Sequence, residues 1–95
     1  MVREIAIFRV QGGSEEDFIE AYSGVSDVLE QAEGSHGVTL HRGVENPNTF
    51  TLIVEWDSVE AHTNLTKQPE FEKFGEAVAP YLAGAPDVRH VKPVE

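Results

Sequence analysis

The sequence contains no cysteine among its 95 residues, and it has few basic side chains. The absence of cysteine excludes thiol nucleophiles, disulfide bonds and cysteine-ligated metals. Seven lysines and arginines are outnumbered by 17 acidic residues, which gives a formal net charge of −10 and a pI of about 4.7. A surface with this charge repels phosphate backbones and anionic lipid, so we expect no nucleic-acid partner and no membrane partner.

Long apolar runs are also lacking, since no stretch approaches the roughly 18 residues of a transmembrane helix. The opening segment, residues 1–10, is too short and too charged for a signal peptide, so a cytoplasmic location is expected. The length predicts a single domain over residues 1–95. A chain of this size buries only about 60–65% of the surface that its unfolded form exposes, so an oligomer interface would add to a thin core.

The first part of the chain has the pattern of a strand followed by a helix. Residues 3–10 are apolar on both alternating faces, which predicts a strand that is covered on both sides. Residues 15–33 are predicted to form one helix, with Ser14 in a capping box at its start and Gly34 at its end. The apolar face of this helix recurs every three or four residues: Phe18, Tyr22, Val25, Leu29 and Ala32.

A hairpin is predicted next, because residues 38–44 and 50–56 alternate between apolar and polar side chains around a turn-rich segment, residues 45–49. The register that matches apolar with apolar residues pairs Val44 with Phe50 and Leu40 with Val54.

Two further helices and a last strand complete the pattern. A capping signature at residues 57–60 opens a short helix that ends near Lys67, and Pro69 suits the first turn of the next helix, which Pro80 ends or kinks. Residues 87–93 are predicted to form the last strand.

The order of all these elements predicts an α+β fold of the ferredoxin-like βαββαβ type, a four-stranded antiparallel sheet with helices on one face. The apolar residues of the other face predict a homodimer.

Several segments resemble the antibiotic biosynthesis monooxygenase (ABM) domain family. They are residues 50–62, which contain Trp56, and residues 68–71, together with residues 37–42 and 45–48. The likeness spans nearly the whole chain. It implies a dimeric α+β barrel in which two sheets pack face to face, with a pocket in each subunit between sheet and helices. It also implies cofactor-free oxygenation of quinols or anthrone-like aromatics, although related barrels degrade haem, cyclise polyketides or isomerise lactones.

The sequence departs from several branches of this superfamily. Many relatives place a His or Trp nine positions after the strand tryptophan, where this chain has Leu65. Haem-degrading relatives carry an iron-ligating His at the position of Gly75 and an Asn at that of Phe8, and cyclase relatives use a Tyr and a His where Leu65 and Phe71 stand. Neither activity is therefore expected. One subgroup is similar in having histidines at the positions of His62 and His90.

Four histidines are the groups that titrate near neutral pH. The helix that follows the third strand crosses toward the fourth, so His62 and His90 are expected to approach each other. We interpret them as a catalytic, proton-shuttling pair, or otherwise as half-exposed residues that join helix to sheet. His36 lies in a glycine-flanked loop and is expected to be solvated. The spacing of the histidines indicates no metal site, and no cofactor is predicted.

Four other residues are candidates for substrate contact. His41 and Glu55 share a face of the predicted hairpin. A contact between them would raise the pKa of the histidine. Alternatively, the two side chains lie at a dimer interface or on the surface. Trp56 could stack on a flat substrate or fill the seam between sheet and helices. The Tyr22 hydroxyl could bind a substrate oxygen or a backbone carbonyl.

The sequence therefore favours a cofactor-independent monooxygenase that acts on a small electron-rich aromatic, with His62 and His90 as catalytic residues. Two alternatives stay open: a non-catalytic module for small-molecule binding or dimerisation, and an isomerase or cyclase on the same barrel.

Overall fold

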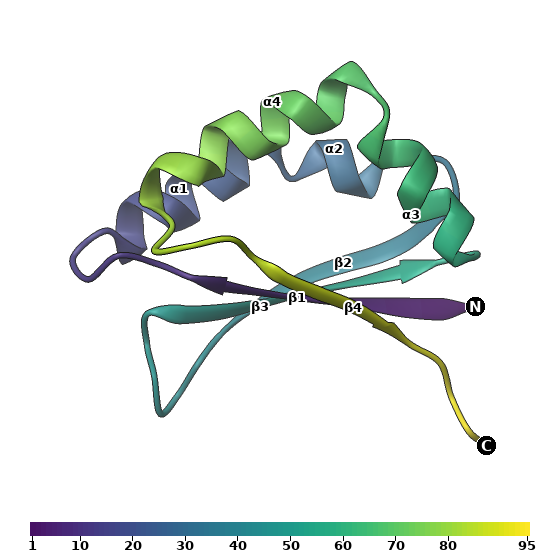
Figure 1. The fold of residues 1–95 in the computed structure, drawn as a ribbon, viewed down its shortest axis with the longest axis horizontal. Coiled ribbons are helices and arrows are strands. Elements are labelled where there is room, and N and C mark those ends of the chain that lie inside the picture. Colours follow the sequence, from purple (N-terminus) through teal and green to yellow (C-terminus); the bar gives the residue numbers. More distant parts are fainter.

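The computed structural model describes residues 1–95 as a four-stranded antiparallel sheet with helices on one face. The strand order is β2-β3-β1-β4, and the predicted ferredoxin-like α+β fold is confirmed. All helices lie on one side of the sheet (Figure 1). The elements in chain order are β1 (Val2–Arg9), α1 (Glu15–Val25), α2 (Asp27–Glu30), β2 (Ser35–Arg42), β3 (Thr49–Trp56), α3 (Val59–Thr66), α4 (Pro69–Val78), a 3-10 turn (Ala79–Tyr81) and β4 (Asp87–Val91).

The core lies between the helices and the sheet. Every second residue of β3 is at most 2% exposed, from Phe50 to Trp56. The Phe18 ring from α1 packs 4.9 Å from the ring of Phe50 and 5.7 Å from that of Phe8. Burial of a side chain of this size stabilises the fold by about 1.5–3 kcal/mol. No helix of the chain is long or apolar enough to cross a bilayer.

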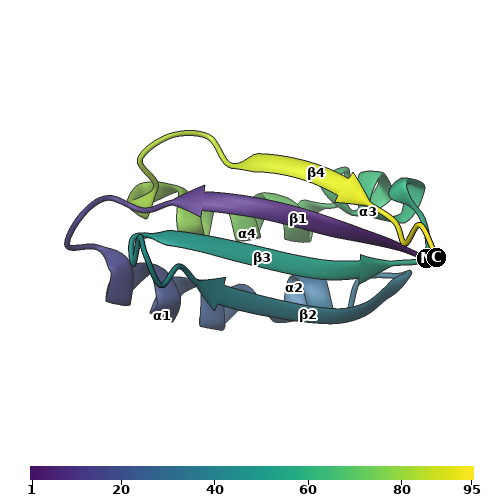
Figure 2. The same ribbon diagram turned by 90° about the horizontal axis from the view of Figure 1, so that it is seen from below.

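The opposite sheet face is not covered by this chain, as the view from below shows (Figure 2). Ile5 and Ile53 pair across β1 and β3 on this face, and both are half-buried, as is Ile7. An ion pair of 2.6 Å joins Arg3 to Glu55 on the same face. The predicted apolar residues on both faces of β1 are present, but the chain itself covers only one of these faces.

The predicted continuous helix over residues 15–33 is wrong, because the helix is interrupted at Ser26. The Ser26 hydroxyl donates a weak hydrogen bond of 3.4 Å to the Ser23 carbonyl, as serine often does at the expense of helix continuity. The predicted capping box is also absent, since the Ser14 side chain makes no cap hydrogen bond. The Gly13 N–H donates instead to Glu15. Gly34 ends this region with a φ of +86°, which favours glycine.

The hairpin forms with the predicted faces but in a register displaced by two residues. Val38 lies opposite Val54 and Leu40 opposite Leu52. The displacement arises because β2 ends at Arg42, so Val44 is 87% exposed in the turn. Gly43 makes this early turn: its N–H donates to the Thr49 carbonyl at 2.7 Å, and a Cβ there would lie 2.5 Å from the Asn46 carbonyl oxygen.

The predicted elements of the second half are confirmed. The Ser58 hydroxyl accepts a hydrogen bond from the Ala61 N–H and caps α3. Pro69 is the first residue of α4, which ends at Val78, two residues before Pro80. The last strand ends at Val91 rather than at residue 93.

Candidate functional site

A carboxylate is buried in the helix-facing layer of β1. Glu4 is only 4% exposed, although the next residues on that face, Ala6 and Phe8, belong to the apolar core. In the sheet, Glu4 lies opposite Val54 on one side and His90 on the other. Because an isolated buried charge is costly by several kcal/mol, such a carboxylate needs partners.

Glu4 has two partners on this side of the sheet. The Trp56 Nε1–H donates a hydrogen bond of 2.9 Å to Glu4 Oε1. His62 Nε2 lies 3.6 Å from Glu4 Oε2, which is an ion-pair distance rather than a hydrogen-bond distance. On its other side, His62 Nδ1 lies 2.8 Å from His90 Nε2. We call these four residues the Glu4 cluster.

Four different elements hold the Glu4 cluster in place. Glu4 and His90 are neighbours on β1 and β4, and Trp56 ends β3. His62 lies in the first turns of α3, whose start is fixed by the Ser58 cap. The imidazole of His62 stacks on the fully buried Trp56 indole, with ring centroids 5.4 Å apart and planes 16° apart.

The electrostatics of the cluster favour a neutral His62. Burial lowers the pKa of His62, the Glu4 carboxylate raises it, and the neighbouring His90 lowers it again; the net effect is a lowered pKa. An ionised Glu4 only accepts hydrogen bonds, so the tautomer of His62 that carries its proton on Nε2 suits the carboxylate. With this tautomer, His62 Nδ1 would accept from His90 Nε2–H, and His90 Nδ1 would keep a free lone pair.

The six residues predicted for the site are divided between the two faces of the sheet. His62, His90 and Trp56 come together as described, and the expected approach of the two histidines is confirmed; their catalytic role stays a prediction. Tyr22 is buried on α1, where its ring packs edge-on against Phe74 at 6.1 Å. Burial, and secondly the charge of Glu30, raise the pKa of Tyr22 to about 12.

Of the two interpretations of His41 and Glu55, the direct contact between them is wrong, whereas a position at an interface or on the surface stays open. In the observed register His41 lies opposite Thr51 and Glu55 opposite Gly37, several residues apart along the strands. His41 Nε2 instead contacts the Thr39 hydroxyl at 3.0 Å, and Glu55 pairs with Arg3. His36 is exposed as expected, but its Nε2 lies 2.5 Å from Asp57 Oδ1.

Glu4 was not predicted as part of the site. The signal was visible in the alternation of β1, since Glu4 occupies the same face as Ala6, Phe8 and Val10. A charged residue on an otherwise apolar face of a strand indicates that a buried partner is present.

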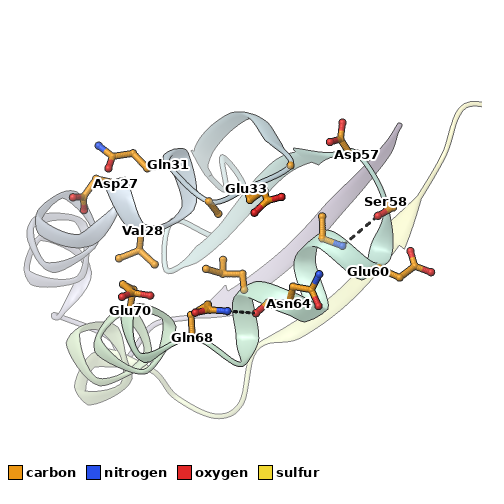
Figure 3. Close-up of a pocket in the computed structure, with 14 residues that line it drawn as sticks. Asp27, Val28, Gln31, Glu33, Asp57, Ser58, Glu60, Asn64, Gln68 and Glu70 are labelled. Atoms are coloured by element: carbon orange, nitrogen blue, oxygen red, sulfur yellow. Dashed lines mark hydrogen bonds between the residues drawn. The ribbon is translucent and has the colours of Figure 1, made fainter.

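A groove of about 630 Å³ is bordered by α2, α3 and the start of α4. Figure 3 shows that its labelled residues are mostly polar. Its acidic lining residues are Asp27, Glu33, Asp57, Glu60 and Glu70. None of the six predicted site residues lines it, so it differs from the apolar pocket between sheet and helices that the resemblance implied.

The cluster offers a base and its supporting groups rather than a metal site. His62 Nδ1 and His90 Nε2 face each other at hydrogen-bond distance, which leaves no room for an ion between them. No three histidine or acidic side chains are arranged to hold a metal ion. A histidine with a free nitrogen lone pair, backed by a second histidine and a carboxylate, can accept a proton from a bound molecule.

Comparison with known proteins identifies the family. Residues 1–77 match the family model of antibiotic biosynthesis monooxygenase. The chain belongs to this family. It is 34% identical to a Bordetella bronchiseptica protein assigned to the antibiotic biosynthesis monooxygenases, whose crystal structure matches with a TM-score of 0.94 over 99% of this chain and 97% of that chain.

Two further relatives have lower identity. SnoaB, a cofactor-independent oxygenase from Streptomyces nogalater, has a TM-score of 0.84 and 18% identity over 99% of this chain and 93% of that chain, and shares the fold. The Bacillus subtilis protein YczJ is 25% identical over 95 residues, which cover 99% of this chain and 100% of that protein.

Proposed function

We propose that the protein is a cofactor-independent monooxygenase that acts on a small electron-rich aromatic of the quinol or anthrone type. His90 is the catalytic base, and His62 supports it. The observation that carries the proposal is the 2.8 Å contact between the two histidines, backed by the buried Glu4 carboxylate. Membership of the antibiotic biosynthesis monooxygenase family supports the same reaction class.

The reaction requires a base, a substrate anion and molecular oxygen. His90 Nδ1 takes a proton from the ring CH₂ of an anthrone-like substrate, and the resulting anion is delocalised over the aromatic system. The anion transfers one electron to O₂, and the substrate radical and superoxide combine to a peroxide. The proton held by His90 neutralises the peroxide, which loses water to leave a carbonyl. One oxygen atom enters the substrate, and the other leaves as water with both hydrogens of the CH₂ group.

The substrate is proposed to lie against the helix-facing side of β4. Val88 and His90 point to this same side, because they pair with the buried Ala6 and Glu4. Val88 is 46% exposed and His90 is half-buried, so an apolar surface adjoins the free nitrogen. Trp56 holds the His62 ring in place, because its indole stacks on the imidazole. Tyr22 on α1 stays a proposed substrate contact.

A homodimer is part of this proposal. The uncovered sheet face carries half-buried Ile5, Ile7 and Ile53, and a second copy of the same face would cover them. His41 and Glu55 lie on this face and would then belong to the dimer interface rather than to the site around His90. The cytoplasmic location stays a prediction of the sequence.

Oxygen consumption with a panel of anthrones and hydroquinones tests the proposal. We expect the protein to accelerate oxygen uptake above the rate in buffer, with formation of the oxidised aromatic, and to show no turnover under anaerobic conditions. Turnover of the same panel without oxygen would instead support an isomerase or cyclase. The non-catalytic alternative is favoured by one observation: neither the groove beside α3 nor a cavity of about 300 Å³ between Met1 and Pro93 is lined by His62 or His90. Saturable binding without any product would support it.

A further inference from the structure

The Glu4 cluster contains one buried carboxyl group that the proposed reaction does not itself use. Glu4 is the cross-strand neighbour of His90, but its buried carboxylate oxygens face the Trp56 indole and His62 rather than the surface where the substrate is proposed to lie. We propose that Glu4 is a positioning residue that sets the tautomers of His62 and His90, so that His90 presents Nδ1 as a proton acceptor. This inference rests on the proposed function for its catalytic consequence.

The argument begins at Trp56. The indole N–H can only donate, so the atom of residue 4 that faces it must be an acceptor. The second carboxylate oxygen then faces His62 Nε2 at 3.6 Å. A proton on that nitrogen meets a negative charge, whereas a lone pair there would face another lone pair. The arrangement therefore favours the tautomer with the proton on Nε2.

The tautomer of His62 in turn determines the tautomer of His90. With its proton on Nε2, His62 has a lone pair on Nδ1, which lies 2.8 Å from His90 Nε2. A hydrogen bond at this distance requires His90 to carry its proton on Nε2. His90 Nδ1 is then unprotonated and free to act as a base. When it takes a proton, the positive charge is stabilised through His62 by the carboxylate of Glu4.

The substitution Glu4→Gln is expected to reverse the tautomers of His62 and His90, while it keeps the shape of the side chain at position 4. The Trp56 N–H still needs an acceptor, so the amide oxygen of the new side chain faces the indole and its NH₂ faces His62. The NH₂ dipole favours a lone pair on His62 Nε2, so we expect His62 Nδ1–H to donate to His90 Nε2 and His90 Nδ1 to carry the proton. Glu20→Gln, on the exposed part of α1, is the matched control for loss of one carboxylate.

The test is ¹⁵N NMR of the histidine rings at a pH at which both imidazoles are neutral. In the wild-type protein we expect His62 and His90 as Nε2–H tautomers, and in Glu4→Gln both as Nδ1–H tautomers. Glu20→Gln should match the wild type. A wild-type His90 protonated on Nδ1 overturns the proposal, and so do tautomers that Glu4→Gln leaves unchanged. If the variant fails to fold, a wild-type His90 protonated on Nδ1 still refutes the proposal.

Kinetics separate this inference from the proposed function. In an active enzyme, Glu4→Gln is expected to lower kcat by on the order of 100-fold, because the base is lost, with little change in KM. Reversed tautomers in a protein that never consumes oxygen would retain the role of Glu4 and refute the monooxygenase. A Glu4→Gln enzyme with reversed tautomers and full kcat would show that the tautomer has no catalytic consequence.

Discussion

His62 Nδ1 lies 2.8 Å from His90 Nε2, although the two residues are 28 positions apart in the sequence. The contact joins α3 to the edge strand β4, and Glu4 supports it from the central strand β1. Because His62 is buried and His90 is half-buried, the contact leads from the core to the surface beside β4.

The lowered pKa of His62 predicts that the protein loses stability in acid. Since the folded pKa lies below the unfolded value of 6.5, the unfolded state binds more protons as the pH falls through this window. The contribution of His62 is therefore fully present above pH 6.5 and is lost as the pH falls toward the folded pKa. The groups that face His62 are Glu4 on β1 and His90 on β4, with Trp56 stacked on its ring.

Urea unfolding of the wild type and of His62→Gln at several pH values measures this effect at a fixed protein concentration. The free energy of unfolding of the wild type should fall more steeply below pH 6.5 than that of the variant. Parallel curves for the two proteins would show that His62 does not have a lowered pKa in the folded state.

Substitution of Val88 tests where the substrate lies. Val88→Trp fills the exposed surface beside His90 on β4, so we expect KM to rise by about tenfold while kcat changes little. Val94→Trp, at a site that is 99% exposed near the C-terminus, controls for the added indole. Equal KM values for both variants would place the substrate elsewhere.

The uncovered sheet face predicts that the protein is a dimer in solution. Ile53→Glu introduces a charge at a half-buried position on β3 that is outside the chain's own core, so the fold should persist while the dimer dissociates. Light scattering should then give a mass near 10.5 kDa instead of twice that value. Ser23→Glu, on the exposed side of α1, should keep the wild-type mass. A wild-type monomer at micromolar concentration would refute the interface.

The turn between β2 and β3 depends on the glycine at position 43. Gly43→Ala would place a Cβ 2.5 Å from the Asn46 carbonyl oxygen, so we expect a loss of about 1–3 kcal/mol in the free energy of unfolding. Gly12→Ala meets no atom within 4 Å and has no positive φ, so its effect should stay within about 0.5 kcal/mol. Similar stabilities for the two variants would contradict this account of the turn.

The fold was predictable because it depends on which face each residue occupies. The alternation in residues 50–56 correctly separates the buried Trp56 from the uncovered Ile53. The register was not predictable in the same way, because a displacement by two residues leaves both faces unchanged. The difference was decided by Gly43, whose close approach to Asn46 ends β2 early and leaves Val44 in solvent.

The site was predictable only in part. The topology brings α3 toward β4, so the approach of His62 and His90 followed from the order of the elements. The contact of His41 with Glu55 depended on the register and failed with it. Glu4 could have been found from its place on an apolar strand face, but its pairing with Trp56 and His62 arises from the packing of β1 against β3 and α3, which lie far from β1 in the sequence.

The rate of oxygen consumption by His90→Ala tests the proposed base most directly, with an anthrone that the wild-type protein oxidises. His36→Ala, at an exposed histidine outside the Glu4 cluster, serves as the matched control. The account predicts that kcat falls by on the order of 100-fold or more in His90→Ala and stays at the wild-type value in His36→Ala. Undiminished oxygen uptake by a folded His90→Ala protein would contradict it.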